Sequence, residues 1–154
     1  MPVGEVCVRE VIFCNRSTTI NEAAQLMRQY HVGDLLVVDE KDGKRIPVGI
    51  ITDRDIVLSV VAVKLDPGVI SAGDIFSEKI VTVREDQNLF DTIQLMRAHG
   101  IRRMPVVDQQ GTLAGIVSVD DLVQLLAEEM SELAKLISKE QAQEVQRKPL
   151  PVTG

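Results

Sequence analysis

Residues 49–56 of the chain read Gly-Ile-Ile-Thr-Asp-Arg-Asp-Ile, and residues 115–122 repeat this pattern as Gly-Ile-Val-Ser-Val-Asp-Asp-Leu. The segments that precede the two motifs also match, because residues 19–39 correspond to residues 88–108 at a constant offset of 69. The offset falls to 66 at the motifs, so the first copy contains three additional residues in between. An internal repeat of this length decides the architecture, because each unit must bury its apolar face against the other.

Each copy of the repeat is predicted to fold in the order strand, helix, strand, strand, helix. A short apolar run at residues 11–14 predicts the first strand, and Thr19 with Glu22 has the capping-box spacing of a helix start. Asp42-Gly43 predicts a hairpin between two further strands. Apolar residues at helical spacing mark the expected buried faces of the first helices. These residues are Ile20, Ala23, Ala24, Met27 and Tyr30 in the first copy and Leu89, Ile93 and Met96 in the second.

The repeat also divides the chain into segments. We expect the first strand of the second copy at residues 80–83, and Gly33 and Gly100 at the ends of the first helix of each copy. The expected segments are a first repeat at 6–65, a linker at 66–79, a second repeat at 80–127, a helical extension at 128–146 and a flexible tail at 147–154.

The composition is that of an ordinary globular protein, with 45% apolar and 26% charged residues. Aromatic residues make up only 3% and the net charge is −6, so neither base stacking nor binding to a nucleic-acid backbone is expected. No apolar stretch is long enough to cross a membrane and no signal peptide is recognisable, so we expect a cytoplasmic protein without membrane contact. Cys7 and Cys14 lack the spacing of a metal site, and we expect two reduced thiols and no metal.

The ordered set of motifs resembles one protein family. A Gly-x-x-x-x-Pro-Val-x-Asp segment occupies residues 100–108, and a Gly-apolar-apolar-Thr/Ser-x-x-Asp motif occurs at residues 49–55 and 115–121. This order, present twice, resembles the cystathionine-β-synthase (CBS) domain, and the tandem copies resemble a stand-alone CBS pair, or Bateman module. The resemblance implies an α/β (α+β) fold in which two β-α-β-β-α repeats are related by pseudo-two-fold symmetry. A long C-terminal helix is expected to follow them.

The strand-to-helix junction of the first copy, residues 52–55, permits two interpretations. Thr52 and Asp55 have the spacing of a capping box, which stabilises a helix and needs no ligand. The same hydroxyl and carboxylate could instead hold the phosphate and the ribose of a nucleotide. The CBS resemblance favours the second interpretation for at least one of two clefts.

The first cleft implied by the resemblance combines the junction of the first copy with two segments of the second. In it Asp55 would accept the ribose hydroxyls, and Arg54 and Arg103 would contact phosphate. The purine would lie between apolar side chains, namely Ile80, Ile101 and Met104. The full set of candidate ligand-binding residues is Thr52, Arg54, Asp55, Ile80, Val81, Thr82, Ile101, Arg102, Arg103, Met104 and Pro105.

The second cleft is expected to bind more weakly. Its candidate residues are Phe13, Cys14, Val32, Gly33, Leu35, Ser118 and Asp121. Asp34 stands at the position that corresponds to Arg103. Asp120 likewise corresponds to Arg54, and Leu36 replaces the proline. Repulsion between these two carboxylates and a phosphate predicts that the cleft is empty, or holds a nucleoside or a cation-bridged ligand.

We therefore expect a regulatory module that binds an adenine nucleotide (AMP, ADP, ATP or an adenosyl compound), with or without Mg²⁺, and that signals to an unknown partner protein. A ligand-free module for dimerisation or interaction is the alternative. An enzyme is not expected, because the sequence contains no catalytic motif. His31 and His99 lie at expected helix ends, where the helix dipole favours a cation.

A helical pattern continues well past the second repeat. Apolar residues recur every three or four positions from Val119 to Ile137, and no Gly or Pro follows before Pro149. The pattern predicts a helix from Val119 to about Gln143. Its apolar stripe, with the disc-like assemblies that the CBS resemblance implies, favours a homodimer; a helix folded back onto its own repeats is the alternative. The tail is expected to fray or be disordered after about Gln146.

Overall fold

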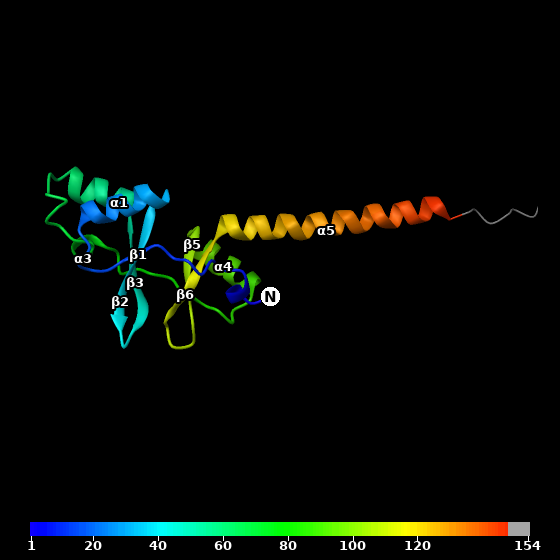
Figure 1. The fold of residues 1–154 in the computed structure, drawn as a ribbon, viewed down its shortest axis with the longest axis horizontal. Helices are drawn as coiled ribbons and strands as arrows, with labels where there is room; N and C mark the ends of the chain where they lie inside the picture. Colours follow the sequence, from blue (N-terminus) through cyan, green and yellow to red (C-terminus); the bar gives the residue numbers. More distant parts are fainter. Residues whose placement is uncertain (148–154) are drawn as a thin grey trace, which may run out of the picture. The chain divides into compact units, whose positions relative to one another are not determined.

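A computed structural model describes residues 1–147 of the chain (Figure 1). It divides into two compact units, the first formed by Met1–Ser118 and the second beginning at Val119. From residue 148 onward, the tail that was predicted to be flexible lies outside the described residues.

The first unit contains the strands of both copies of the repeat. After a short 3-10 turn, η1 (Val3–Glu5), the elements of the first copy are β1 (Phe13–Cys14), α1 (Ile20–Tyr30), β2 (Asp34–Lys41), β3 (Lys44–Thr52), α2 (Asp53–Ile56) and the π-helical turn η2 (Val57–Val61). The elements that follow in this unit are α3 (Ala72–Ile75), β4 (Val83–Arg84), α4 (Leu89–His99), β5 (Arg103–Val107) and β6 (Leu113–Ser118).

Two three-stranded sheets of the same topology form the framework of this unit. β2 lies in the centre of the first sheet, parallel to β1 and antiparallel to β3, and β5 has the same place between β4 and β6. The register shifts after Val37 in one sheet and after Val106 in the other, which are equivalent positions at the offset of 69. The predicted order of strands and helices is therefore confirmed in both copies.

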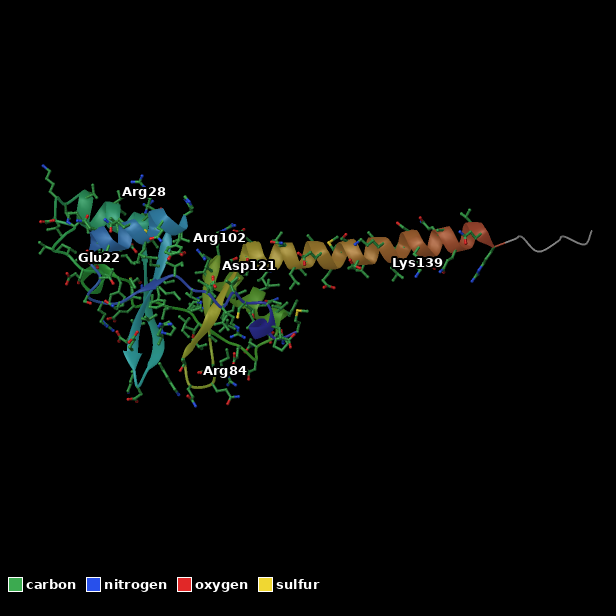
Figure 2. The ribbon with its side chains drawn as sticks, viewed as in Figure 1. Glu22, Arg28, Arg84, Arg102, Asp121 and Lys139 are labelled. Atoms are coloured by element: carbon green, nitrogen blue, oxygen red, sulfur yellow. The ribbon has the colours of Figure 1, made fainter. Side chains whose placement is uncertain are left out.

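The first helix of each copy begins at a residue that caps it. The Thr19 hydroxyl accepts a hydrogen bond from the Glu22 amide at 3.2 Å, and the Glu22 carboxylate (labelled in Figure 2) accepts one from the Thr19 amide at 3.1 Å. α1 ends before the predicted Gly33, because His31 adopts the left-handed conformation with φ of 54°. Gly100 has φ of 61° at the equivalent position and ends α4 as predicted.

The buried faces of α1 and α4 are narrower than predicted. The fully buried positions are Ile20, Ala23 and Met27 in α1 and Thr92 and Met96 in α4. Ala24 and Tyr30 are exposed, and so is Ile93, because each helix packs against its small sheet along a single stripe. Thr92 is accommodated in that stripe since its hydroxyl donates a hydrogen bond to the carbonyl of Asn88 at 2.9 Å.

The first strand of the second copy begins later than predicted. β4 pairs only with Val106 and Val107 of β5, so residues 80–82 precede the ladder. A local bond accounts for the difference, because the amide of Ile80 donates to the carbonyl of Glu78 at 3.0 Å and turns the chain before the strand.

The N-terminal segment packs on the second copy of the repeat, although it precedes the first copy in the chain. The amide of Val3 donates to the carbonyl of Gln87 at 2.7 Å, and Val8 forms a β-bridge with Ile116 of β6. Val3 is completely buried as a result.

The predicted linker, residues 66–79, precedes the second copy in the chain but packs on the first copy. The amide of Ala72 donates to the carbonyl of Thr18 at 2.7 Å, and Ser77 forms a β-bridge with Ile50 of β3. The two exchanged segments are themselves equivalent at the offset of 69. Neither copy is therefore complete without a segment that belongs to the other.

The second unit is described by a single helix, α5 (Val119–Gln146), which is 28 residues long and ends three residues past Gln143. At 1.5 Å per residue its length is about 42 Å. Lys139 lies in the second half of this helix (Figure 2). Four apolar residues, Leu126, Met130, Leu133 and Ile137, recur along one face and are between 50% and 70% exposed.

Candidate functional site

The strand-to-helix junction of the first copy forms a complete capping box. Thr52 ends β3, and its hydroxyl accepts a hydrogen bond from the amide of Asp55 at 3.1 Å. Asp55 Oδ2 in turn accepts one from the amide of Thr52 at 2.9 Å. The structural interpretation of this motif is thus confirmed, but it does not exclude a ligand. A carboxylate has about four acceptor positions, and the capping bond uses one of them.

Arg103 brings the second copy to this junction. It begins β5, and its Nη1 lies 3.2 Å from Oδ1 of Asp34, the first residue of β2. Asp34 is paired with Thr52 across the β2–β3 ladder. Residues directly opposite each other in an antiparallel pair present their side chains on the same face of the sheet. The guanidinium of Arg103 therefore reaches the face of the first sheet on which Thr52 lies.

The ion pair between Arg103 and Asp34 is only partly shielded from water, with side-chain exposures of 36% and 31%. One atom of the guanidinium is nevertheless fully buried. Arg103 Nε is covered by protein, and none of residues 1–147 accepts a hydrogen bond from it. A buried donor without an acceptor is unfavourable, and because Nε is covered by protein, only the exposed part of the guanidinium can meet a ligand.

Arg54, the other predicted phosphate contact, is in the first turn of α2. Its side chain is exposed and lines an open surface depression of about 370 Å³ together with Asp53, Val57 and Leu58. Neither Asp55 nor Arg103 lines this depression. Arg54 thus belongs to the junction by sequence, whereas Arg103 approaches the junction from the second copy through Asp34.

The residues predicted to surround the purine differ in their accessibility. Ile80, Val81 and Ile101 are half-buried, whereas Thr82 and Arg102 are exposed. Met104 is completely buried in β5, and Pro105 beside it is buried as well. Both residues are covered by protein in this structure, so their contact with a purine stays a prediction.

Residues of the second predicted cleft are engaged in packing. The half-buried ring of Phe13 lies 4.4 Å from the guanidinium of Arg45, in a cation–π contact. Cys14 and Leu35 are buried, and desolvation raises the pKa of the Cys14 thiol to about 11. Val32 is half-buried and adjoins the exposed Gly33.

The remaining residues of that cleft lie at the end of β6 and the start of α5. Ser118 is paired with Arg103 in the β5–β6 ladder, and Asp121 lies in the first turn of α5. Asp34, expected to repel a phosphate there, is instead paired with Arg103. The charge of Asp34 is therefore partly balanced, and the repulsion of a phosphate at this cleft stays a prediction.

Sequence reasoning did not anticipate that Asp34 and Arg103 touch each other. The signal was present, because the two residues are equivalent at the offset of 69 and have opposite charges. Equivalent residues near a pseudo-two-fold axis approach one another, so complementary charges at such a pair of positions indicate a contact.

Residues 1–147 contain neither a metal-binding cluster nor a membrane-spanning helix. No group of three His, Cys, Asp or Glu side chains lies close enough together to hold a metal ion. None of the helices in this range combines the length and the apolar character that a membrane span requires.

Comparisons with known proteins agree with this architecture. A family model of the CBS domain matches residues 3–62 and again residues 72–128. An uncharacterised protein of Methanopyrus kandleri is 42% identical over 123 residues, and the match spans 80% of this chain and 61% of that protein.

Two solved structures resemble the chain and contain adenine compounds. A CBS domain protein from Pyrobaculum aerophilum complexed with AMP has a TM-score of 0.68 and 30% identity, and the match covers 79% of this chain and 90% of that one. The CBS domain pair of protein MJ0100, in complex with 5′-methylthioadenosine and S-adenosyl-L-methionine, has a TM-score of 0.69 and 26% identity, and the match covers 84% and 98%. With two family matches on two equivalent sheets, the chain belongs to the CBS domain family as a tandem pair of CBS domains.

Proposed function

We propose that the chain is a regulatory module that binds one adenine nucleotide in its first cleft and transmits the binding to a partner protein. The observation that carries this proposal is the contact between Arg103 and Asp34, because it brings a cation of the second copy to the Thr52–Asp55 junction of the first. A hydroxyl, a carboxylate and a guanidinium thus converge from both copies. The AMP and S-adenosyl-L-methionine complexes of similar CBS structures support an adenine compound as ligand.

Each of these groups has a role that suits its chemistry. The Asp55 carboxylate accepts hydrogen bonds from the two ribose hydroxyls, in addition to its capping bond with Thr52. The accessible part of the Arg103 guanidinium donates to a phosphate oxygen. The half-buried side chains of Ile80 and Ile101 cover the purine. Neutral ligands such as nucleosides would lose the contribution of Arg103 but keep the others.

A ligand held by both copies can shift their relative arrangement. Binding favours whichever arrangement places Asp55 and Arg103 at the right separation, and a ligand shifts an equilibrium only by its difference in affinity for the two states. Regulation rather than catalysis is proposed, because the groups at this junction bind and orient a ligand without supplying a nucleophile paired with a base. The protein that responds to this shift is not identified by the site.

Calorimetric titration of the full chain with AMP, ADP, ATP and S-adenosyl-L-methionine, each with and without Mg²⁺, tests the proposal. At least one compound is expected to bind. Arg103→Gln is expected to lower the affinity most for the compounds that carry a phosphate. A chain that binds none of the compounds would favour a ligand-free interaction module instead.

We also propose that the chain forms a homodimer to which α5 contributes. Its exposed apolar residues, Leu126, Met130, Leu133 and Ile137, are spaced by four, three and four positions, which is the spacing of a coiled-coil seam. A soluble monomer rarely leaves such a stripe uncovered, and a second copy of the same helix offers a complementary surface.

Light scattering on the full chain and on a chain truncated after Glu128 tests the dimer. We expect the full chain to be a dimer and the truncated chain to dissociate. A chain that is monomeric in both forms would rule the dimer out and favour a helix that covers its own repeats. A dimer that survives truncation would place the interface on the helices of the repeats.

A further inference from the structure

The contact between Asp34 and Arg103 joins two positions that are equivalent in the repeat. Each residue begins the central strand of its own sheet, and the two lie 69 residues apart. The first copy thus supplies an anion where the second copy supplies a cation. Asp34 consequently occupies part of the guanidinium that the proposed phosphate contact requires.

The ion pair leaves part of the Arg103 side chain accessible, since 36% of it is exposed. Asp34 Oδ1 contacts Nη1 of Arg103 at 3.2 Å, while the buried Nε finds no acceptor among residues 1–147. The guanidinium has five N–H donors arranged in a planar fork. A phosphate oxygen that accepts from an accessible N–H of Arg103, and not from the buried Nε, would lie on the same guanidinium as the carboxylate of Asp34.

Two anions on one guanidinium repel each other. A unit charge held a few Å from another interacts significantly even with water-like screening, and the repulsion grows with the number of charges on the ligand. Asp34 therefore opposes a triphosphate more strongly than a monophosphate and has no such effect on an uncharged nucleoside.

We infer that Asp34 is a specificity residue of the first cleft. Its carboxylate lowers the affinity of the cleft for adenine ligands in proportion to the negative charge of the ligand. This inference rests on the proposed function, since it concerns the same cleft. It assigns to the cleft a preference for weakly charged adenine ligands, such as a monophosphate or an adenosyl compound, over a triphosphate. No feature of the family motif supplies this preference, because it depends on the acidic residue at position 34 of this chain.

The test compares wild type with Asp34→Asn in calorimetric titrations with adenosine, AMP and ATP in Mg²⁺-free buffer of low ionic strength. The affinity for adenosine is expected to stay within about twofold, because no charge on the ligand senses the substitution. AMP is expected to bind about fivefold tighter, the factor for one unit charge at contact distance under water-like screening. ATP is expected to gain more than AMP because it carries more charge.

Asp39→Asn is the matched control. Asp39 lies in the same strand and also forms an ion pair with an arginine, Arg16, at 2.9 Å. The control therefore removes one carboxylate charge and one Asp–Arg pair at a different position of β2. Its affinities for the three ligands are expected to equal those of the wild type.

Two outcomes would overturn the inference while leaving the proposed function in place. An equal change for adenosine, AMP and ATP would show that Asp34 acts on the shape of the cleft and not through charge. Weaker binding of AMP to Asp34→Asn would show that Asp34 holds Arg103 in position.

If wild type bound no adenine compound, the proposed function would fail, and titration with pyrophosphate would still decide the role of Asp34. Asp34→Asn would then have to bind pyrophosphate more tightly than Asp39→Asn does, and an equal affinity would refute the inference.

Discussion

The two copies of the repeat share a backbone but differ in the charges at their strand ends. The helix preceding the central strand ends in a left-handed residue in both copies, at His31 and at Gly100. The central strand then begins with Asp34 in one copy and Arg103 in the other. The same fold therefore accommodates opposite charges at an equivalent position. The charge of each cleft can vary without a change in its architecture.

The largest effect on nucleotide affinity is expected from the strand-to-helix junction carboxylates, Asp55 in the first copy and Asp121 in the second. Asp55→Ala is expected to weaken adenine-nucleotide binding more than tenfold, because it removes the acceptor of two ribose hydroxyls, and a charge-assisted hydrogen bond contributes about 1.5–3 kcal/mol. Asp121→Ala, the equivalent change in the second copy, should have a much smaller effect. Calorimetry on both variants measures the contrast.

A matched variant separates the loss of a ligand contact from the loss of a helix cap. Glu22→Ala removes the same kind of capping bond on α1, in which the Glu22 carboxylate accepts from the amide of Thr19. It should reduce stability by about 1 kcal/mol and leave binding unchanged. Equal affinity of Asp55→Ala and wild type, with the fold intact by circular dichroism, would refute the assignment of Asp55.

The next effect is a loss of stability at two equivalent glycines, Gly49 and Gly115, each of which faces an exchanged segment. Gly49 faces Phe76 and Ser77 of the exchanged segment, and a Cβ at Gly115 would lie 2.7 Å from the carbonyl oxygen of Val8. Gly49→Ala and Gly115→Ala should therefore each lower the free energy of unfolding by about 1–3 kcal/mol, the usual cost of overpacking. Urea denaturation of both variants measures this change in the free energy of unfolding. If only one substitution were destabilising, the exchange of segments would be structurally unequal in the two copies.

The sequence alone was sufficient to predict the repeat, its strand and helix order and the helix caps. These features depend on local patterns, such as the capping box of Thr19 and Glu22, which act within a few residues. The exchange of segments was not predicted, because the bridge between Val8 and Ile116 spans more than a hundred residues and has no periodic signal. Likewise, the burial of Met104 depends on packing around β5, which one sequence does not specify.

The smallest effect is expected where the copies differ by an exchange between two small apolar side chains. Cys14 in β1 is buried and corresponds to Val83 in β4. Burial raises the pKa of its thiol to about 11, so the side chain is neutral near pH 7 and behaves as a small apolar residue. Cys14→Val should change the free energy of unfolding by less than about 1.5 kcal/mol. A larger loss in urea denaturation would indicate that the sulfur has a specific partner.

The number of AMP molecules bound per chain tests the central claim most directly. The account assigns the phosphate-bearing ligand to the cleft that contains Arg103 and Asp55, and the second cleft lacks an arginine at the equivalent position, where Asp34 stands. Calorimetry of the full chain with AMP should therefore give a stoichiometry near one. Tight binding of two equivalent AMP molecules per chain, or of none, would contradict the account.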